Sequence, residues 1–204
     1  MTEYERWESR FAAPDYIFGT APNAFLAAQA RLLPKGPKRG RALAIADGEG
    51  RNGVWLAEQG LDVFAFDFSP TAQEKARALA AARGVSIATK LVDVGSYDWP
   101  PDAFDVVIDI FTQFSDPAER AQKFAGIRRT LKSGGLLLLQ GYRPEQIAYG
   151  TGGPKVPENM YTRALLEREF ASFRRIEIEE YDVEMHEGTA HAGMSAVINL
   201  VGWK

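Results

Sequence analysis

The sequence predicts an α/β fold built around a mostly parallel sheet, and three observations predict it. Apolar runs alternate with helical patterns from residue 42 onward, a glycine-rich turn follows the first run, and residues 106–108 and 136–139 are apolar without interruption. Strands that are apolar at every position are buried on both faces, as in parallel sheets that lie between two helical layers. We therefore expect helices on both faces of the sheet.

The elements of the N-terminal half follow from local signals. Asn23 is expected to cap a helix over residues 24–33. Ser69 and Pro70 provide a cap and a first-position proline for a helix that runs to about residue 82. The other expected elements of this half are a helix from about 52 to 60 and strands at 42–46, 63–66 and 86–91.

The C-terminal half continues the alternation and ends in a hairpin. Asp116 and Glu119 form a capping box, and the helix that they open is expected to end at Gly134 and Gly135. Thr162 is expected to cap a last helix that ends near Phe170. The expected strands are 105–111, 136–140, 174–185 and 193–203, of which the last is antiparallel and follows a turn at 187–191. This makes seven strands in all.

Composition excludes several classes of protein. The 204 residues fit one domain, and 46% of them are hydrophobic. The net charge is −3 and no basic run exceeds a pair, so we expect no nucleic-acid partner. No run approaches the ~20 apolar residues of a membrane span, and the charged N-terminus is not a signal peptide, so we expect a cytoplasmic protein without a membrane partner. Its oligomeric state is left open between monomer and homodimer.

No metal site is expected either. The chain contains no cysteine, which excludes a thiolate nucleophile and every cysteine-based metal site. Asp105 and Asp109 lie four positions apart on one strand, and so on one face, but no third ligand accompanies them.

The most informative segment is a glycine loop followed by an acid. Residues 48–53 read Gly-Glu-Gly-Arg-Asn-Gly, which is G-x-G-x-x-G between a strand and a helix. Asp67 ends the second strand, 17 positions after Gly50, where a carboxylate accepts hydrogen bonds from ribose hydroxyls. The alternative is that the glycines only make a tight turn and Asp67 only caps a helix.

Two ligand classes fit this loop, a dinucleotide and S-adenosylmethionine. A pyrophosphate favours amide donors and positive charge, and Glu49 within the loop opposes it. No Tyr-x-x-x-Lys pair is present, and only some 60 residues follow the fifth strand, which leaves little for a separate substrate domain. S-adenosylmethionine has no phosphate, so the loop fits it better.

In motif order, residues 41–140 resemble a class I S-adenosylmethionine-dependent methyltransferase. The segments that carry the resemblance are 46–50, 66–69, 92–94, 104–107 and 131–135. Two positions depart from the pattern: Ala46 stands where glycine is usual, and Ala44 where an acid is common. The missing acid leaves one contact that braces the loop unexplained, whereas alanine at 46 is expected to shift the loop only slightly.

A narrower resemblance, to small bacterial tellurite-resistance and thiopurine S-methyltransferases, is carried by residues 7–11, 16–23 and 50–52. It implies a single Rossmann-like domain over 1–204: an N-terminal lid and helix (1–40), cofactor-binding βα units (41–140), and a substrate-side loop with a C-terminal hairpin (141–204). The resemblance implies that the following residues contact the cofactor: Tyr16, Gly48, Gly50, Asn52, Asp67, Phe68, Asp93, Val94 and Phe111.

The expected reaction is methyl transfer to a small soft nucleophile such as a thiol or a selenium or tellurium oxyanion. His191 is the candidate base and Gln113 the candidate group that orients the substrate; the alternatives are a histidine that bonds the hairpin backbone and an amide that braces its loop. The candidate substrate-side residues are Trp7, Arg10, Phe18, Tyr142 and Arg143.

These substrate-side residues have alternatives too. Trp7 and Phe18, with Tyr16, form a lid over the pocket or only fix the N-terminal arm to the core. The two arginines bind an anionic substrate or form surface salt bridges. Two other functions remain open at this point: an NAD(P)-dependent oxidoreductase, and a regulatory protein that binds S-adenosylmethionine without turnover.

Overall fold

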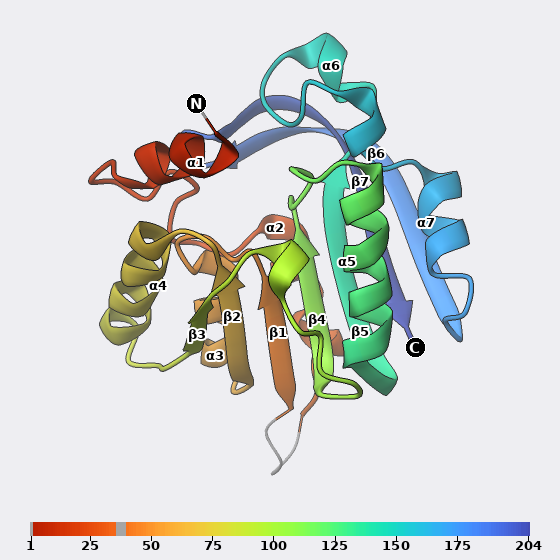
Figure 1. The fold of residues 1–204 in the computed structure, drawn as a ribbon, viewed down its shortest axis with the longest axis horizontal. Coiled ribbons are helices and arrows are strands. Elements are labelled where there is room, and N and C mark those ends of the chain that lie inside the picture. The colour runs from red at the N-terminus through yellow and green to blue at the C-terminus, as the bar shows by residue number, and fades with distance from the viewer. Residues whose placement is uncertain (1, 36–39) are drawn as a thin grey trace. The chain divides into compact units, whose positions relative to one another are not determined.

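The computed structural model describes residues 2–35 and 40–204, which divide into two compact units (Figure 1). The first unit runs to Tyr97 and includes Glu187–Ala190. The second comprises Asp98–His186 and His191–Lys204. Among the described residues, none of the helices has the length and apolarity that crossing a bilayer requires.

The first unit contains a parallel sheet of three strands in the order β3-β2-β1. Leu43 of β1 pairs with Phe64 of β2, and Ala65 of β2 pairs with Thr89 of β3. Its helices and strands are α1 (Glu3–Phe11), α2 (Ala24–Ala28), β1 (Arg41–Ile45), α3 (Arg51–Glu58), β2 (Asp62–Asp67), α4 (Pro70–Ala82) and β3 (Ala88–Leu91), with short 3₁₀ turns η1 (Ala30–Leu32) and η2 (Val94–Ser96).

The second unit has its strands in the order β4-β5-β7-β6. β4 and β5 are parallel, with Ile108 opposite Leu138, whereas β5 and β7 are antiparallel, with Leu138 opposite Val201. Its elements are β4 (Phe104–Ile110), α5 (Pro117–Thr130), β5 (Leu131–Tyr142), α6 (Gln146–Tyr149), η3 (Pro157–Asn159), α7 (Arg163–Glu169), β6 (Arg175–Glu187) and β7 (His191–Trp203).

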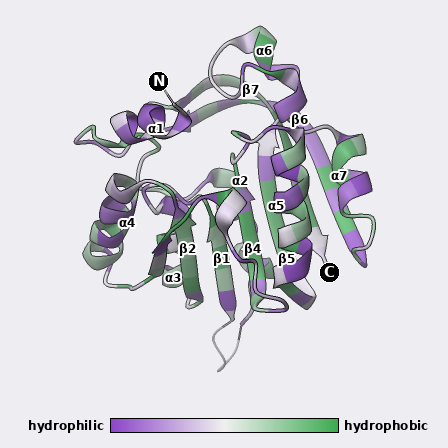
Figure 2. Cartoon of the chain, viewed as in Figure 1, coloured by the Kyte–Doolittle hydropathy of each residue, from purple (hydrophilic) through white to green (hydrophobic). Residues whose placement is uncertain are grey.

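The predicted α/β class is confirmed. The described residues form three strands in the first unit and four in the second, so the expected seven are present, and the last strand is antiparallel to its neighbour. Figure 2 shows hydrophobic colour along much of β4, whose four consecutive positions 106–109 are buried. This burial on both faces accounts for the uninterrupted apolar runs of the sequence.

Local capping chemistry explains where the predicted helices begin. In each case a side-chain oxygen accepts a main-chain N–H of the first turn, which would otherwise lack a partner inside the helix. The residues that do so are the four that the sequence predicts: Asn23, Ser69, Asp116 and Thr162.

Three expectations about the elements are wrong. Residues 24–33 form the short α2 followed by a 3₁₀ turn instead of one helix. α5 ends at Thr130, before Gly134, because Leu131 turns to extended backbone and pairs with Phe104 as the first residue of β5. The N-terminal arm contains α1, which the sequence analysis did not anticipate although Thr2 and Glu5 form a capping box.

Candidate functional site

The glycine loop turns the chain sharply between β1 and α3. Ala46 and Gly48 have positive φ angles of 44° and 55°, and Gly50 follows at 87° as the residue that precedes α3. A Cβ atom on Gly50 would lie 2.6 Å from the Cβ of Ala76 in α4. Glycine is therefore required at position 50 both by the left-handed backbone and by the close approach of α4. Ala46 adopts a conformation that glycine favours.

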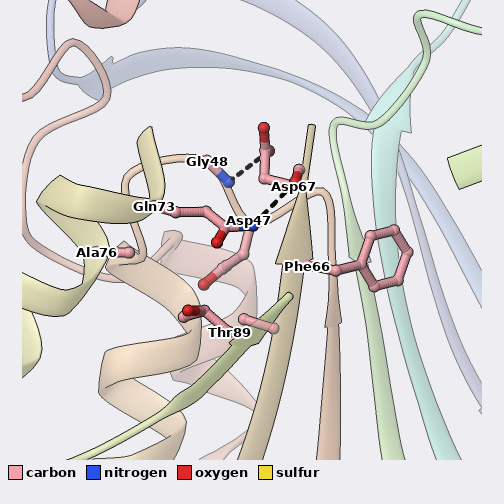
Figure 3. A pocket seen from close by; sticks show the side chains of 8 residues that line it. Asp47, Gly48, Phe66, Asp67, Gln73, Ala76 and Thr89 are labelled. Carbon is pink, nitrogen blue, oxygen red and sulfur yellow. Dashed lines mark hydrogen bonds between the residues drawn. The ribbon is translucent and has the colours of Figure 1, made fainter. Parts of the chain in front are cut away.

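Asp67 connects this loop to the end of β2. Its Oδ2 accepts from the main-chain N–H of Gly48 at 2.9 Å (Figure 3). Its Oδ1 accepts from the main-chain N–H of Ser69, also at 2.9 Å. The N–H of Phe68 also acts on this carboxylate. A carboxylate has about four acceptor positions, so at least one is left for a further donor. Burial raises the pKa of Asp67 to about 6, although the N–H groups of Ser69 and Gly48 act to lower it.

Asp47 supplies the bracing contact that the sequence left unexplained. Its two carboxylate oxygens accept from the main-chain N–H of Gly53 at 3.2 and 3.0 Å, which ties the loop to the first turn of α3. Burial raises the pKa of Asp47 to about 7, and the nearby Asp67 adds to the rise. The acid that is missing at Ala44 is therefore replaced by an acid three positions later.

A small cavity lies beside these two acids. Its empty volume, counted with the solvent that opens onto it, is about 180 Å³. Gln73 crosses it and donates to the main-chain oxygens of Asp67 and Lys90. In Figure 3 the ring of Phe66 points away from Asp47 and Gln73. This cavity does not hold a nucleoside; it separates the end of β2 from α4.

Glu49 is turned into the protein and does not oppose a ligand. Its carboxylate accepts from the main-chain N–H of Ile17 at 2.9 Å and from Lys75 Nζ at 2.8 Å. Lys75 also donates to the main-chain oxygens of Ala13 and Asp15, and the Tyr16 hydroxyl donates to the main-chain oxygen of Lys75. The segment that contains Tyr16 is therefore held against the glycine loop.

A second group of contacts fixes the start of α3. Arg51 forms an ion pair of 2.8 Å with Glu187, and both side chains are largely buried. Glu187 also accepts from the side chain of Asn23 and the main chain of Ala24. Asn52 accepts from the main-chain N–H of Asn23 at 2.9 Å. Asn52 is predicted to contact the cofactor. In the structure its side-chain oxygen already accepts a hydrogen bond from the main chain.

The N-terminal helix α1 contributes an aromatic group. The Trp7 ring stacks on Phe11 at 5.6 Å and lies 6.1 Å from the Phe18 ring. The guanidinium of Arg10 lies 4.5 Å from the centre of the Trp7 ring. Glu8 fixes the helix, because it accepts hydrogen bonds from the hydroxyls of Ser69 and Thr71 at the start of α4. Three of the candidate substrate-side residues thus lie together.

The remaining candidates of the first unit have separate surroundings. Asp93 is exposed and accepts from the main-chain N–H of Gly95 at 2.8 Å, while Val94 is buried. The half-buried Phe68 follows Asp67 directly and lies 5.8 Å from the Tyr4 ring.

The second unit gathers Phe111, Tyr142 and His191. Phe111 lies beyond the end of β4 with a φ of 55°, and its ring centre lies 4.6 Å from that of Tyr142 and 4.5 Å from that of His191. The rings of Tyr142 and His191 meet edge to face at 5.9 Å. His191 is 8% exposed and Tyr142 is 2% exposed. We call these three side chains the aromatic cluster.

Gln113 and Arg143 make the structural contacts that the sequence analysis gave as their alternatives. The Gln113 amide donates to the main-chain oxygen of Tyr142 at 2.8 Å and accepts from the N–H of the same residue. Arg143 forms an ion pair with Asp182 and donates to the main-chain oxygen of Val197. Both side chains therefore brace the surroundings of Tyr142.

Sequence reasoning missed several residues of this region, namely Glu8, Asp47, Lys75 and the Arg51–Glu187 pair. Asp47 had a local signal, since it stands within the loop itself. The others bond to partners far along the chain, as in the Arg51–Glu187 pair, and no pattern in the sequence announces such a pair.

Comparisons with known proteins give one family match and several similar folds. Residues 42–135 match the family described as a methyltransferase domain. Among solved structures, the protein of "Conversion of a Disulfide Bond into a Thioacetal Group during Echinomycin Biosynthesis" is 20% identical with a TM-score of 0.73, over 99% of this chain and 91% of that one.

Two further structures are similar at low identity. TehB from Haemophilus influenzae is 15% identical with a TM-score of 0.72, over 91% of this chain and 63% of that one. N-methyltransferase NodS from Bradyrhizobium japonicum, in complex with S-adenosyl-l-homocysteine, is 14% identical with a TM-score of 0.72, over 98% of this chain and 97% of that one. These similarities show the Rossmann-like α/β fold.

Proposed function

We propose that this chain, whose residues 42–135 match a methyltransferase domain, is an S-adenosylmethionine-dependent methyltransferase that methylates a small molecule at a soft nucleophilic atom, such as thiol sulfur or a selenium or tellurium oxyanion. The residues proposed to contact the cofactor are those that the sequence analysis named: Tyr16, Gly48, Gly50, Asn52, Asp67, Phe68, Asp93, Val94 and Phe111. We further propose that it works in the cytoplasm.

The observation that carries the choice of acceptor is the aromatic cluster. The buried imidazole of His191 packs against the rings of Phe111 and Tyr142, so the cluster offers a mainly aromatic surface whose polar groups are the imidazole and the Tyr142 hydroxyl. Such a lining suits a polarisable atom, because sulfur makes favourable contacts with aromatic rings. Among the proposed acceptors it favours a thiol over a chalcogen oxyanion, and it disfavours a protonated amine, because both ions are strongly hydrated and burial would remove water without replacing its hydrogen bonds.

The reaction is an in-line displacement in which an acceptor lone pair forms the new bond to the methyl carbon and the old carbon–sulfur bond breaks. The bound cofactor supplies an activated methyl group and a neutral leaving group. The protein chiefly aligns the reactants, and such alignment contributes roughly 7–11 kcal/mol. We propose that His191 accepts the proton of a thiol acceptor, whereas an oxyanion acceptor carries no proton to remove.

The comparisons support sulfur chemistry only through what they say of other proteins. One similar structure comes from a study of the conversion of a disulfide bond into a thioacetal group during echinomycin biosynthesis. NodS is described as an N-methyltransferase, so an amine is a second candidate acceptor. A protonated amine is strongly hydrated. No comparison favours an NAD(P)-dependent oxidoreductase or a regulatory protein without turnover, the two alternatives of the sequence analysis.

The test is a panel of acceptors with methyl-labelled S-adenosylmethionine, made up of thiols, selenite, tellurite, phenols and primary amines. We expect methyl-labelled product with at least one thiol or chalcogen oxyanion. In a separate assay with NAD⁺ in place of S-adenosylmethionine, we expect no oxidised product. Product with amines alone would replace the soft-nucleophile proposal by the second candidate. Cofactor binding without product from any acceptor would favour the regulatory protein.

The chain offers a matched control for His191. His186 is exposed on β6, so the variants His191→Gln and His186→Gln remove the only two histidines one at a time. We expect His191→Gln to slow the methylation of a weakly acidic thiol by roughly 10²–10⁴-fold, and that of an already ionised acceptor much less. Equal losses with both acceptors would contradict the role of His191 as a base.

A further inference from the structure

A buried ionic network lies beneath the loop that follows β4. Lys123 of α5 and Asp109 of β4 form an ion pair of 3.1 Å, and both side chains are 0% exposed. Lys123 Nζ also donates to the hydroxyl of Tyr161 at 2.9 Å and to the main-chain oxygen and hydroxyl of Thr112. The Thr112 hydroxyl in turn donates to Asp109. We call these four residues the Lys123 network.

Stability alone does not account for such a network. Removing two charges from water is costly, and a buried ion pair is often no more stable than two apolar side chains of similar volume. Burial lowers the pKa of Lys123, but Asp109 and Tyr161 outweigh this effect and raise it, so the ammonium stays charged. The contribution of the network lies instead in the parts of the chain that it holds together.

The network joins three segments, namely the end of β4 with the residues that follow it, α5, and the stretch that contains Tyr161. Asp109 stands two residues before Phe111 and Thr112 stands one residue after it. Phe111 holds its positive φ between these two anchored residues, and its main-chain N–H donates to Gln140 at 2.8 Å. A non-glycine residue in this conformation persists only where its surroundings impose it. The Lys123 network imposes it from the side of α5.

A second link runs from Tyr161 to Tyr142. The main-chain N–H of Tyr161 donates to the oxygen of Tyr142 at 3.0 Å, and Gln113 bonds the same residue. Between them, Gly141 leaves no room for a side chain, since a Cβ there would lie 2.6 Å from Tyr161 and 2.7 Å from Gln113. The network thus fixes the main chain next to Phe111 through Asp109 and Thr112. It fixes the main chain of Tyr142 through Tyr161.

We propose that the Lys123 network positions the aromatic cluster for the methyl acceptor, with Lys123 and Thr112 as positioning residues that touch no reactant. This inference rests on the proposed function for its kinetic consequence only. The geometric consequence, that loss of the network shifts Phe111 and Tyr142 against His191, does not depend on the acceptor.

The first measurement needs no acceptor. The chain has two histidines, so the Cε1–H proton signals of His186 and His191 are separable by NMR and assigned with His186→Gln. The variant T112V removes one hydroxyl from the network at nearly constant volume. The double variant K123M/D109L removes both charges together. In each we expect the His191 signal to move, because two aromatic rings adjoin it, and the His186 signal to stay.

The second measurement is kinetic, with an acceptor from the panel. We expect T112V and K123M/D109L to lower kcat by roughly 10–100-fold, and the dissociation constant of S-adenosylmethionine to stay within about twofold. The matched control is K132M, which removes a lysine from a partly exposed ion pair with Asp105 in the same unit. We expect K132M to change neither measurement.

Two outcomes decide the proposal. An unchanged His191 signal in T112V, with wild-type kcat, would overturn it. So would a K123M/D109L variant with the wild-type melting temperature, His191 signal and kcat. If wild-type protein methylates nothing in the panel, the proposed function fails instead, and the His191 signal still decides whether the network sets the cluster.

Discussion

The main-chain N–H of Gly48 donates to Asp67 Oδ2 at 2.9 Å, so one hydrogen bond joins the turn after β1 to the acid that ends β2. The same carboxylate accepts from Ser69 through its other oxygen. Asp67 therefore holds the glycine loop in place, and we propose that it also accepts hydrogen bonds from the cofactor. Its substitution affects both, and the variants below are chosen to separate them.

Asp67→Ala is expected to weaken S-adenosylmethionine binding by about 1–3 kcal/mol, the range for a lost hydrogen bond to a charged group. Isothermal titration measures this as a dissociation constant roughly 5–150 times larger. The control is Asp62→Ala at the other end of β2, where Asp62 makes only an exposed ion pair of 3.5 Å with Arg41. A change below threefold for Asp67→Ala would argue against a ribose contact.

Cofactor affinity is expected to rise with pH until about pH 6 and then to level off. Burial raises the pKa of Asp67 to about 6, with Glu8 adding to the rise, and its neighbour Asp47 titrates at about 7. Ribose hydroxyls need the charged carboxylate as acceptor. Below pH 6 the dissociation constant therefore increases by up to about tenfold per pH unit. Titrations from pH 5 to 8 check this.

The same raised pKa gives the opposite trend for the stability of the free protein. Between pH 3.8 and about 6, the folded chain keeps the proton of Asp67 that the unfolded chain has released, so the free energy of unfolding falls as the pH rises. Urea unfolding across this range measures the slope. Asp67→Asn is expected to reduce both the slope and the pH dependence of binding; an unaltered pH dependence of binding would mean that another group titrates.

Ala46→Gly is expected to stabilise the protein. Ala46 has a φ of 44°, where a non-glycine residue incurs about 1–2 kcal/mol of steric cost. Glycine removes that cost but loses about 0.4–1 kcal/mol through the greater entropy of the unfolded chain. The net gain in unfolding free energy is about 0–1.6 kcal/mol, with a midpoint of about 0.8 kcal/mol. Ala44→Gly, within β1, is the control and is expected to destabilise; a loss of stability in Ala46→Gly would contradict the strain.

Arg51→Met is expected to destabilise the first unit by about 3–5 kcal/mol, because it leaves the carboxylate of Glu187 buried without its ion-pair partner. Thermal and urea unfolding measure the loss. The matched control is Arg83→Met, since Arg83 forms a longer and more exposed ion pair with Glu58 and such pairs contribute about 0–1 kcal/mol. Similar losses in the two variants would show that burial of the Arg51 pair has no energetic consequence.

The predictions from sequence succeeded where the signal was local. A cap such as Ser69 or Thr162 accepts from an N–H group of the next turn, so the capping residue and its partner lie within four residues in the sequence. The end of α5 was mispredicted because it depends on a distant strand, since Leu131 leaves the helix to pair with Phe104. Gly134 marks a turn inside β5 instead of the end of the helix.

The same distinction applies to the site. The glycine loop and Asp67 were found because their spacing is a local motif, and Asp47 belonged to that motif without being assigned a task. Glu49 was interpreted as facing a ligand, because its partners Ile17 and Lys75 lie on segments that the loop's own sequence does not specify. Burial of a charged side chain in the middle of a motif is set by tertiary contacts.

The charges along β6 bear on how this chain behaves when many copies are concentrated. β6 is the outermost strand of its sheet, and residues 177–184 include five exposed acids: Glu177, Glu179, Glu180, Asp182 and Glu184. A second copy that extended the sheet at this edge would bring carboxylates against carboxylates, and like charges across neighbouring strands repel. Outer strands guarded in this way resist fibril growth, so even at high concentration we expect this edge to stay unpaired with the edges of other copies.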